Sequence, residues 1–435
     1  MDAEHSKARD VATTAGWVYG RKVPGLRVVK ELACGSRTGD VISLRRGGHV
    51  KGYHLKRRLW VAGVVVLSAL TVAGVTALTV QRPAVAASHR AAGQVVLTVR
   101  TSGGHDALWL VPPAGGAPTA AGTLPGVAGS VAVSPDGANV AYLPASGKAS
   151  IWIGYGALAP KTIDLGSAGL KKVGSMTWLS ADRLLVSGTT NPRYFDLRAG
   201  RLYTVDVRTG SVNAFRGLSG AEPSADPTSG KVAYVRFTKL DGGTARNNHA
   251  PLYRESLMLL STSGSGAGRL LSSEQYRIYA DQRAFSQPLL APGAKWVLTG
   301  QTGSDVRVTY ALFDTGLAAM PWLTVFAPTV QAAAWAPDGS KVAFGGTVPS
   351  GSFSNACLYV DDVSSGALTR TPAALRPGAS VNRLTGVAWS DEGMLAADAL
   401  VSGHGAANDR VFVLSGDDLS TLKDLGQGHL SVWVP

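Results

Sequence analysis

The hydrophobic and polar positions of this chain repeat one pattern: an apolar strand, a tight turn, and a second strand in which apolar and polar residues are expected to alternate. Three copies are plain, namely VAVSPDGANVAYL (131–143), AAWAPDGSKVAFGG (333–346) and GVAWSDEGMLAADA (386–399). Three copies are more divergent, namely MTWLSADRLLVSG (176–188), SADPTSGKVAYVRF (224–237) and LLAPGAKWVLTGQ (289–301). Pro fixes φ at about −65°, Asp can bond the backbone two residues on, and Gly accepts a positive φ, so these residues favour tight turns. The pattern predicts six β-hairpins.

A second pattern follows each copy. It is an apolar strand that ends in a Thr-Gly or Ser-Gly turn, as in RLYTVDVRTG (201–210), SLMLLSTSG (256–264), VTYALFDTG (308–316) and CLYVDDVSSG (357–366). SIWIGY (150–155) and RVFVLSG (410–416) occupy the same place without the full turn. Two hairpins per repeat make a four-stranded antiparallel sheet, which is the blade of a β-propeller.

The two ends of the repeat region supply a further blade. QVVLTVR (94–100) and ALWLVPP (107–113) have the pattern of a second and a third strand, and the last strand, HLSVWV (429–434), fits the missing first place. Such closure removes exposed sheet edges. We therefore expect an all-β fold, a seven-bladed propeller of four-stranded antiparallel blades over residues 93–435, with six blades as the alternative.

The S/A-P-D-G turns between an A-W strand and a V-A-Y/F strand resemble the repeat of TolB-type, WD-like propellers. The resemblance covers about residues 93–435 and implies the fold more than the function. The architecture of one N-terminal span and a propeller is similar to that of exported actinobacterial proteins. TolB itself has an α/β domain ahead of its propeller and a periplasmic lipoprotein partner. This chain lacks room for that domain, so we do not transfer the partner.

An uncharged apolar run, LWVAGVVVLSALTVAGVTALTV, covers residues 59–80. As a helix it would be roughly 33 Å long, enough to cross a hydrocarbon core of about 30 Å. Its N-terminal flank is basic, with Arg45, Arg46, Lys51, Lys56, Arg57 and Arg58. The positive-inside rule then predicts a single-pass protein of the cell membrane, with residues 1–58 as a basic cytoplasmic tail, 59–80 as a signal anchor, 81–92 as a linker and 93–435 outside the cytoplasm.

Two alternatives stay open for this N-terminal part. Ala84-Val85-Ala86 resembles a signal-peptidase site, so the apolar run is either a retained anchor, which its length favours, or a cleaved signal peptide. Translation starting at Val50 would leave only a short basic head on the span.

The charge of the chain is uneven, and this bears on its partners. The net charge is +13, yet residues 1–58 hold 13 basic and five acidic residues, whereas residues 91–435 hold 27 basic and 24 acidic residues. The high isoelectric point therefore belongs to the tail, and we expect no nucleic-acid partner for the propeller. Only two cysteines are present, Cys34 and Cys357, which excludes a disulfide scaffold and a thiolate metal cluster.

Long loops point to one candidate binding face. The connections between second and third strands are expected at 189–200, 238–255, 347–355 and 401–409, and the inter-blade segment 272–286 opens on the same side. Loops on a rigid scaffold often carry binding residues. The candidates are Arg193, Tyr194, Arg246, Asn248, His249, Tyr253, Tyr276, Arg277, Tyr279 and Arg283. Arg and Tyr suit interfaces and anionic or sugar ligands, although each residue taken alone is as well explained as part of a solvated insertion.

Other residues have structural explanations. Trp178, Trp335 and Trp389 share one slot of the repeat, which favours packing between blades over ligand stacking. Asp206, Asp314 and Asp362 precede strand-ending turns and are explained by turn chemistry. Cys357 lies on an apolar strand and is expected to be an inert buried thiol.

Catalysis has little support in the sequence. No H-E-x-x-H, P-loop, G-x-S-x-G or EF-hand pattern occurs, and only His249 with Asp281 offers an acid–base pair across loops. We therefore expect a non-enzymatic, monomeric propeller without metal or cofactor that binds a protein or a cell-envelope component. The alternatives are a propeller hydrolase or lyase and a transmembrane sensor. The tail lacks a His-x₃-Cys-x₂-Cys pattern, which weakens the sensor hypothesis.

Overall fold

The computed structural model describes residues 42–43, 93–101, 103–154, 161–190, 200–240, 252–277, 285–302, 308–316, 321–326, 332–350, 353–365, 367–370, 380–402 and 408–433. No helix in these ranges is long and apolar enough to cross a bilayer. The apolar run 59–80 lies outside them.

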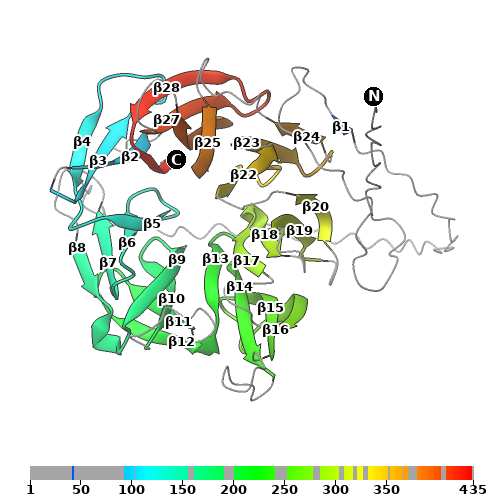
Figure 1. Cartoon of the computed structure of the whole chain (residues 1–435). Helices are drawn as coiled ribbons and strands as arrows, with labels where there is room; N and C mark the ends of the chain where they lie inside the picture. The colour runs from blue at the N-terminus through cyan, green and yellow to red at the C-terminus, as the bar shows by residue number, and fades with distance from the viewer. Residues whose placement is uncertain are drawn as a thin grey trace, which may run out of the picture. The chain divides into compact units, whose positions relative to one another are not determined.

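Seven antiparallel sheets follow one another around a ring, in the order of the colours in Figure 1. The first three blades contain these strands: blade 1, β29 (His429–Trp433), β2 (Val95–Arg100), β3 (Asp106–Val111) and β4 (Thr119–Thr123); blade 2, β5 (Ala128–Val133), β6 (Val140–Pro144), β7 (Ser150–Gly154) and β8 (Lys161–Asp164); blade 3, β9 (Lys172–Ser180), β10 (Arg183–Thr189), β11 (Arg201–Asp206) and β12 (Val212–Ser219).

The remaining blades have the same order of strands. They contain the following: blade 4, β13 (Ala221–Asp226), β14 (Lys231–Lys239), β15 (Leu252–Ser261) and β16 (Arg269–Arg277); blade 5, β17 (Phe285–Leu290), β18 (Trp296–Thr302), β19 (Val308–Asp314) and β20 (Pro321–Phe326); blade 6, β21 (Ala332–Trp335), β22 (Lys341–Ser350), β23 (Phe353–Asp362) and β24 (Ala367–Arg370); blade 7, β25 (Ser380–Trp389), β26 (Met394–Ser402), β27 (Asn408–Ser415) and β28 (Thr421–Gln427). A two-residue strand, β1 (Ile42–Ser43), pairs with β24.

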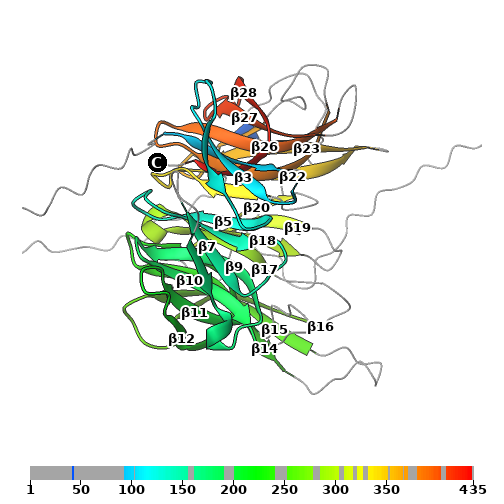
Figure 2. The same ribbon diagram turned by 90° about the vertical axis from the view of Figure 1, so that its left-hand side faces the viewer.

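The last strand of the chain completes the first blade. β29 pairs antiparallel with β2, so that His429 lies opposite Thr98 and Trp433 opposite Val95. Figure 1 shows this junction where the cyan strands of blade 1 meet the red C-terminal strands, and Figure 2 shows the strands of blades 1 and 7 in the upper part of the view. The prediction of seven blades closed by the terminal strand is confirmed, and the six-bladed alternative is wrong.

The turns have the chemistry that the sequence predicts. In the P-D-G turn between β5 and β6, the Gly137 N–H donates to the Ser134 carbonyl (2.8 Å), and Gly137 has a φ of 65°. A side chain at Gly137 would be strained in this conformation. At the ends of third strands, Asp206 accepts hydrogen bonds from the Arg208 and Thr209 amides, and Asp314 and Asp362 cap their turns in the same way.

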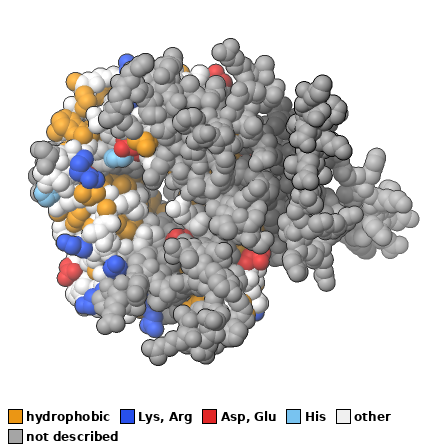
Figure 3. Space-filling model, in the orientation of Figure 1, with side chains coloured by type: hydrophobic (Ala, Val, Ile, Leu, Met, Phe, Trp, Pro, Cys, Tyr) orange, Lys and Arg blue, Asp and Glu red, His pale blue; other side chains and the backbone are white. Residues whose placement is uncertain are grey.

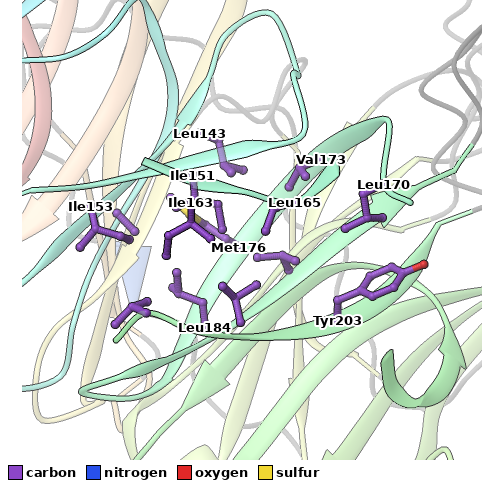
Figure 4. Close-up of a cluster of buried hydrophobic side chains, with 14 of the residues drawn as sticks. Leu143, Ile151, Ile153, Ile163, Leu165, Leu170, Val173, Met176, Leu184 and Tyr203 are labelled. Carbon is purple, nitrogen blue, oxygen red and sulfur yellow. The ribbon is translucent and has the colours of Figure 1, made fainter. Parts of the chain in front are cut away.

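The core consists of separate apolar clusters, each lying between two neighbouring blades. Within β22, Val342 and Phe344 pack against blade 5, whereas Ala343 between them packs against blade 7. A blade strand is thus buried on both faces, which explains why its sequence is apolar at consecutive positions. Figure 4 shows the cluster between blades 2 and 3, where Ile151 and Leu184 come from opposite sheets.

Hydrogen bonds between innermost strands join the blades as well. The indole Nε1 atoms of Trp178, Trp335 and Trp389 each donate to a carbonyl oxygen of the preceding blade, at 3.0 Å in every case; the acceptors are Ala132, Leu289 and Ala334. Between blades 3 and 4, the Thr177 hydroxyl accepts from the Ala225 amide instead (3.1 Å). The three tryptophans therefore pack between blades, as their shared slot predicts.

Candidate functional site

One side of the ring carries the candidate site, and we call it the loop face. Because neighbouring strands are antiparallel, connections between second and third strands and connections between blades lie at the same end of each sheet. The loop face is the side on which the described strand ends border the second-to-third connections, as Lys239 and Leu252 do in blade 4, and border the segments that join successive blades. Figure 3 shows the molecule in the orientation of Figure 1, with much of the visible surface in grey and basic side chains scattered over the coloured part.

Three of the predicted loops are shorter than the sequence suggested, because strands continue into them. Most of the range 347–355 belongs to β22 and β23, which leave only 351–352 between them. Likewise β26 continues to Ser402, and β16 continues to Arg277 before β17 begins at Phe285. Polar residues in these stretches favour a loop, but on a solvated strand end they are equally acceptable.

The structure brings two of the ten predicted site residues together. Tyr253 on β15 and Tyr276 on β16 are direct cross-strand partners, and Lys239 on β14 lies opposite Tyr253. The three residues form one row across blade 4 at its loop-face end, which we call the blade 4 row. Arg277 is next in sequence and lies opposite Leu252. The other predicted residues lie outside the described ranges; they are Arg193, Tyr194, Arg246, Asn248, His249, Tyr279 and Arg283.

Acidic side chains lie just below the blade 4 row. Glu255, opposite Glu274 on β16, is fully buried, and its Oε1 accepts the backbone N–H of Phe285 at the start of blade 5 (3.2 Å). Desolvation raises the pKa of Glu274 above its ordinary value. The blade 4 row therefore lies near the boundary between blades 4 and 5, where the buried Glu255 carboxylate accepts the Phe285 amide.

A second group on the loop face was missed by the sequence analysis. His429, the first residue of β29, has its Nδ1 atom 3.2 Å from Asp398 Oδ2 and its Nε2 atom 3.4 Å from Asp409 Oδ2. Asp398 on β26 is buried, with 2% of its surface exposed, and Asp409 lies near the start of β27. We call these three residues the closure cluster, since they join the terminal strand to blade 7.

Nearby charges shift the pKa of His429 in the closure cluster. The hydrogen bond that the His429 ring donates to Asp398 raises the pKa of His429 above its ordinary value of 6.5, burial opposes this, and the charges of Asp398, Asp409 and Asp106 add to the rise. Asp106 on β3 is itself held by Arg100 Nε (2.6 Å) and by the Ala128 amide (2.8 Å). The imidazole is thus surrounded by carboxylates and favours its cationic form.

The closure cluster is also the described group whose donor set comes nearest to that of a metal site, since its potential ligand atoms all lie within 4.8 Å of one another. However, the two ring nitrogens face two different carboxylates rather than one common point. That arrangement matches an imidazolium that donates a hydrogen bond to Asp398 and forms an ion pair with Asp409. One signal in the sequence pointed to it: Asp398 interrupts the otherwise apolar stretch LAADALV of β26.

Comparisons with known proteins identify no family. No protein-family model matches the chain, and no curated protein matches it. Among solved structures, TolB from Acinetobacter baumannii aligns with a TM-score of 0.42 at 16% identity over 79% of this chain and 67% of its own. The Dos1 propeller aligns with a TM-score of 0.45 at 13% sequence identity over 78% of each chain. The β-propeller domain of the trilobed protease from Pyrococcus furiosus aligns with a TM-score of 0.45 at 15% sequence identity, over 76% of this chain and 94% of its own. The propeller assignment itself rests on the strand order and register given above.

Proposed function

We propose that this chain is a single-pass membrane protein whose propeller lies outside the cytoplasm and binds a protein or cell-envelope ligand through its loop face. The observation that carries the proposal is the blade 4 row, which sets Lys239, Tyr253 and Tyr276 side by side at the loop-face end of a closed ring. Tyrosine offers a flat apolar ring with a polar tip, and such residues are enriched at interfaces.

The rigidity of the ring supports a binding role. Indole and hydroxyl hydrogen bonds join the innermost strands, and the terminal strand closes blade 1. A scaffold fixed in this way holds the strand ends that carry Lys239 and Tyr253 in place, which lowers the entropy lost when a ligand binds.

The described residues do not favour the hydrolase or lyase alternative. Among the described histidines, His429 is the one that lies between carboxylates. Its two ring nitrogens contact Asp398 and Asp409, and these contacts join β29 to blade 7. A histidine that acts as a general base needs a ring nitrogen free to take a proton from a substrate, so His429 is not suited to that role.

The membrane part of the proposal rests on the apolar run 59–80 and its basic flank. It has one structural consequence. If residues 59–80 span the bilayer, residues 42–43 and β24 lie on opposite sides of it, so the β1–β24 pairing can form only in a chain that is not inserted. A reporter that is active only outside the cytoplasm, fused after Pro435, tests the topology: activity supports the anchor, and its absence with an intact fusion contradicts it.

Site-specific photocrosslinking in cells tests the binding role. A photoreactive residue replaces Tyr253 or Tyr276 of the full chain, and a matched control replaces Glu392, which is exposed in the turn between β25 and β26 at the opposite end of the sheets. We expect the same adduct from positions 253 and 276 and none from position 392. Adducts of equal yield at all three positions, or none at 253 and 276, would refute the loop face as the binding surface.

A further inference from the structure

Non-covalent contacts alone hold the terminal strand that closes the ring. β29 pairs with β2 on one side. On the other side, four contacts from residues 428–430 reach blade 7. The His429 ring contacts Asp398 and Asp409, the Leu430 amide donates to Asp398 Oδ2 (3.3 Å), and the Gly428 amide donates to the Asp409 carbonyl (3.0 Å). The closure cluster therefore stands where the two ends of the propeller meet.

The number of protons on His429 decides how many of these contacts are favourable. A neutral imidazole has one N–H and one lone pair, so it donates to one carboxylate and turns a lone pair toward the other. An imidazolium donates from both nitrogens and also places a positive charge between two carboxylates. Asp398 gains most from that charge, because it is buried and its Oδ1 has no hydrogen-bond partner among the described residues.

We propose that His429, held between Asp398 and Asp409, is a pH-dependent latch that fastens the terminal strand to blade 7 when its ring carries two protons. This inference rests on the closure geometry and is independent of the proposed binding function.

The carboxylates that face the latch from the surrounding described strands all favour the imidazolium. Blade 7 supplies Asp398 from β26 and Asp409 from β27, and Arg410, next to Asp409, is engaged with Asp424 of β28 at 2.8 Å. Blade 1 supplies Asp106 from β3, whose negative charge is shared with Arg100 of β2. Among these described neighbours, Arg410 and Arg100 are paired with Asp424 and Asp106, and the imidazolium contacts Asp398 and Asp409 directly.

The pH window follows from the direction of the shift. The pKa of His429 is higher in the folded chain than its ordinary value of 6.5. The folded state therefore binds the proton more tightly, and the latch contributes its full stabilisation below about pH 6.5. That contribution is lost as the pH rises through the folded-state pKa.

Hydrogen exchange of the full chain at two pH values tests the latch. We compare the native chain with His429→Gln, which cannot carry a positive charge, and with a control, His105→Gln, in the exposed connection between β2 and β3. At about pH 6, amides of β29 and β2 should exchange several-fold faster in His429→Gln than in the native chain and the control, and at about pH 9 this ratio should fall toward one. A ratio that is the same at both pH values would overturn the proposal.

A second measurement does not depend on the folding of that variant. The titration of His429 by imidazole NMR shifts is compared in the native chain and in Asp409→Asn, a change at a partly exposed residue. We expect an apparent pKa above 6.5 in the native chain and a lower one in Asp409→Asn. A native pKa at or below 6.5, or no change on substitution, would refute the latch.

Discussion

The indole Nε1 of Trp433 donates a hydrogen bond to the carbonyl oxygen of Gly93 at 3.1 Å, although the two residues are 340 positions apart in the chain. Trp433 is buried, with 4% of its surface exposed, and packs with Val95 and Leu97 of β2. Blade 1 therefore exists only when both ends of the propeller have come together. Bringing the two ends of so long a segment together is entropically costly, and the contacts of the closing strand offset that cost.

Trp433→Ala should destabilise the propeller by about 3–5 kcal/mol, because it removes a large buried side chain and leaves a cavity. Trp433→Phe should cost less, since it retains most of the packing and removes the indole donor to Gly93. Urea unfolding followed by far-UV circular dichroism measures both changes. Equal losses for the two variants would contradict the packing role.

The three inter-blade tryptophans make a matched series. Replacing one of these tryptophans by phenylalanine removes one indole donor, so that a backbone carbonyl of the preceding blade loses a hydrogen bond. The three variants are Trp178→Phe, Trp335→Phe and Trp389→Phe. We expect a loss of about 1–3 kcal/mol in each case, the cost of leaving a buried polar group unsatisfied. Urea midpoints of the three single variants measure this loss. Because the three donor–acceptor distances are all 3.0 Å, losses that differ strongly among them would show that the hydrogen bond is not the cause.

Much of this fold was predictable because its information is local. The turn residues around Gly137 fix where one strand ends and the next begins, and the recurring Trp slot marks the innermost strand of a blade. Even the long-range closure was predictable, since an unpaired apolar strand at the C-terminus matches an incomplete blade at the start. Because the same pattern recurs in blade after blade, the sequence identifies a propeller, which the sequence of a single blade would not do.

The closure cluster was not predictable in the same way. His429 and Asp398 are 31 residues apart, on strands of different blades, and no turn or period relates them. Which face of a strand a polar residue occupies depends on register, and bulges shift the register of β29 against β2 and of β25 against β26. The site residues share this limit: the pairing of Tyr253 with Tyr276 follows from strands that extend into stretches expected to be loops.

Glu255 gives a test of the carboxylates that join blades. Its Oε1 accepts the Phe285 amide across the boundary between blades 4 and 5. Asp106 and Asp398 accept the Ala128 and Leu430 amides in the same manner at other boundaries. Glu255→Ala leaves a buried N–H without this acceptor and should cost about 1–3 kcal/mol, whereas Glu255→Gln keeps an acceptor oxygen and should cost less. Thermal unfolding of the two variants distinguishes them, and a larger loss for Gln than for Ala would contradict this role.

Asp361 on β23 should make the native chain less stable as the pH rises. It is 2% exposed, its Oδ1 has no hydrogen-bond partner among the described residues, and burial, with a smaller effect from Asp362, raises its pKa from 3.8 to about 7. A raised carboxyl pKa stabilises the folded state below the unfolded pKa, and this contribution is lost as the pH rises through about 7.

Asp361→Asn should remove that dependence. At about pH 8 the variant should be more stable than the native chain, by at most roughly 3–4 kcal/mol, and the difference should shrink toward pH 5. Urea midpoints of both chains across this range give the result. Parallel curves would show that Asp361 is ionised in the folded chain over the whole range.

Removal of the terminal strand tests the closed seven-bladed ring most directly. Hydrogen exchange is measured on the full chain and on a chain ending at Gln427, which lacks β29. The closed ring predicts that the truncated chain loses protection over Val95–Arg100 while Lys231–Lys239 of blade 4 stays protected. Unchanged protection over Val95–Arg100 would contradict the pairing of β29 with β2 and with it the closure of the ring.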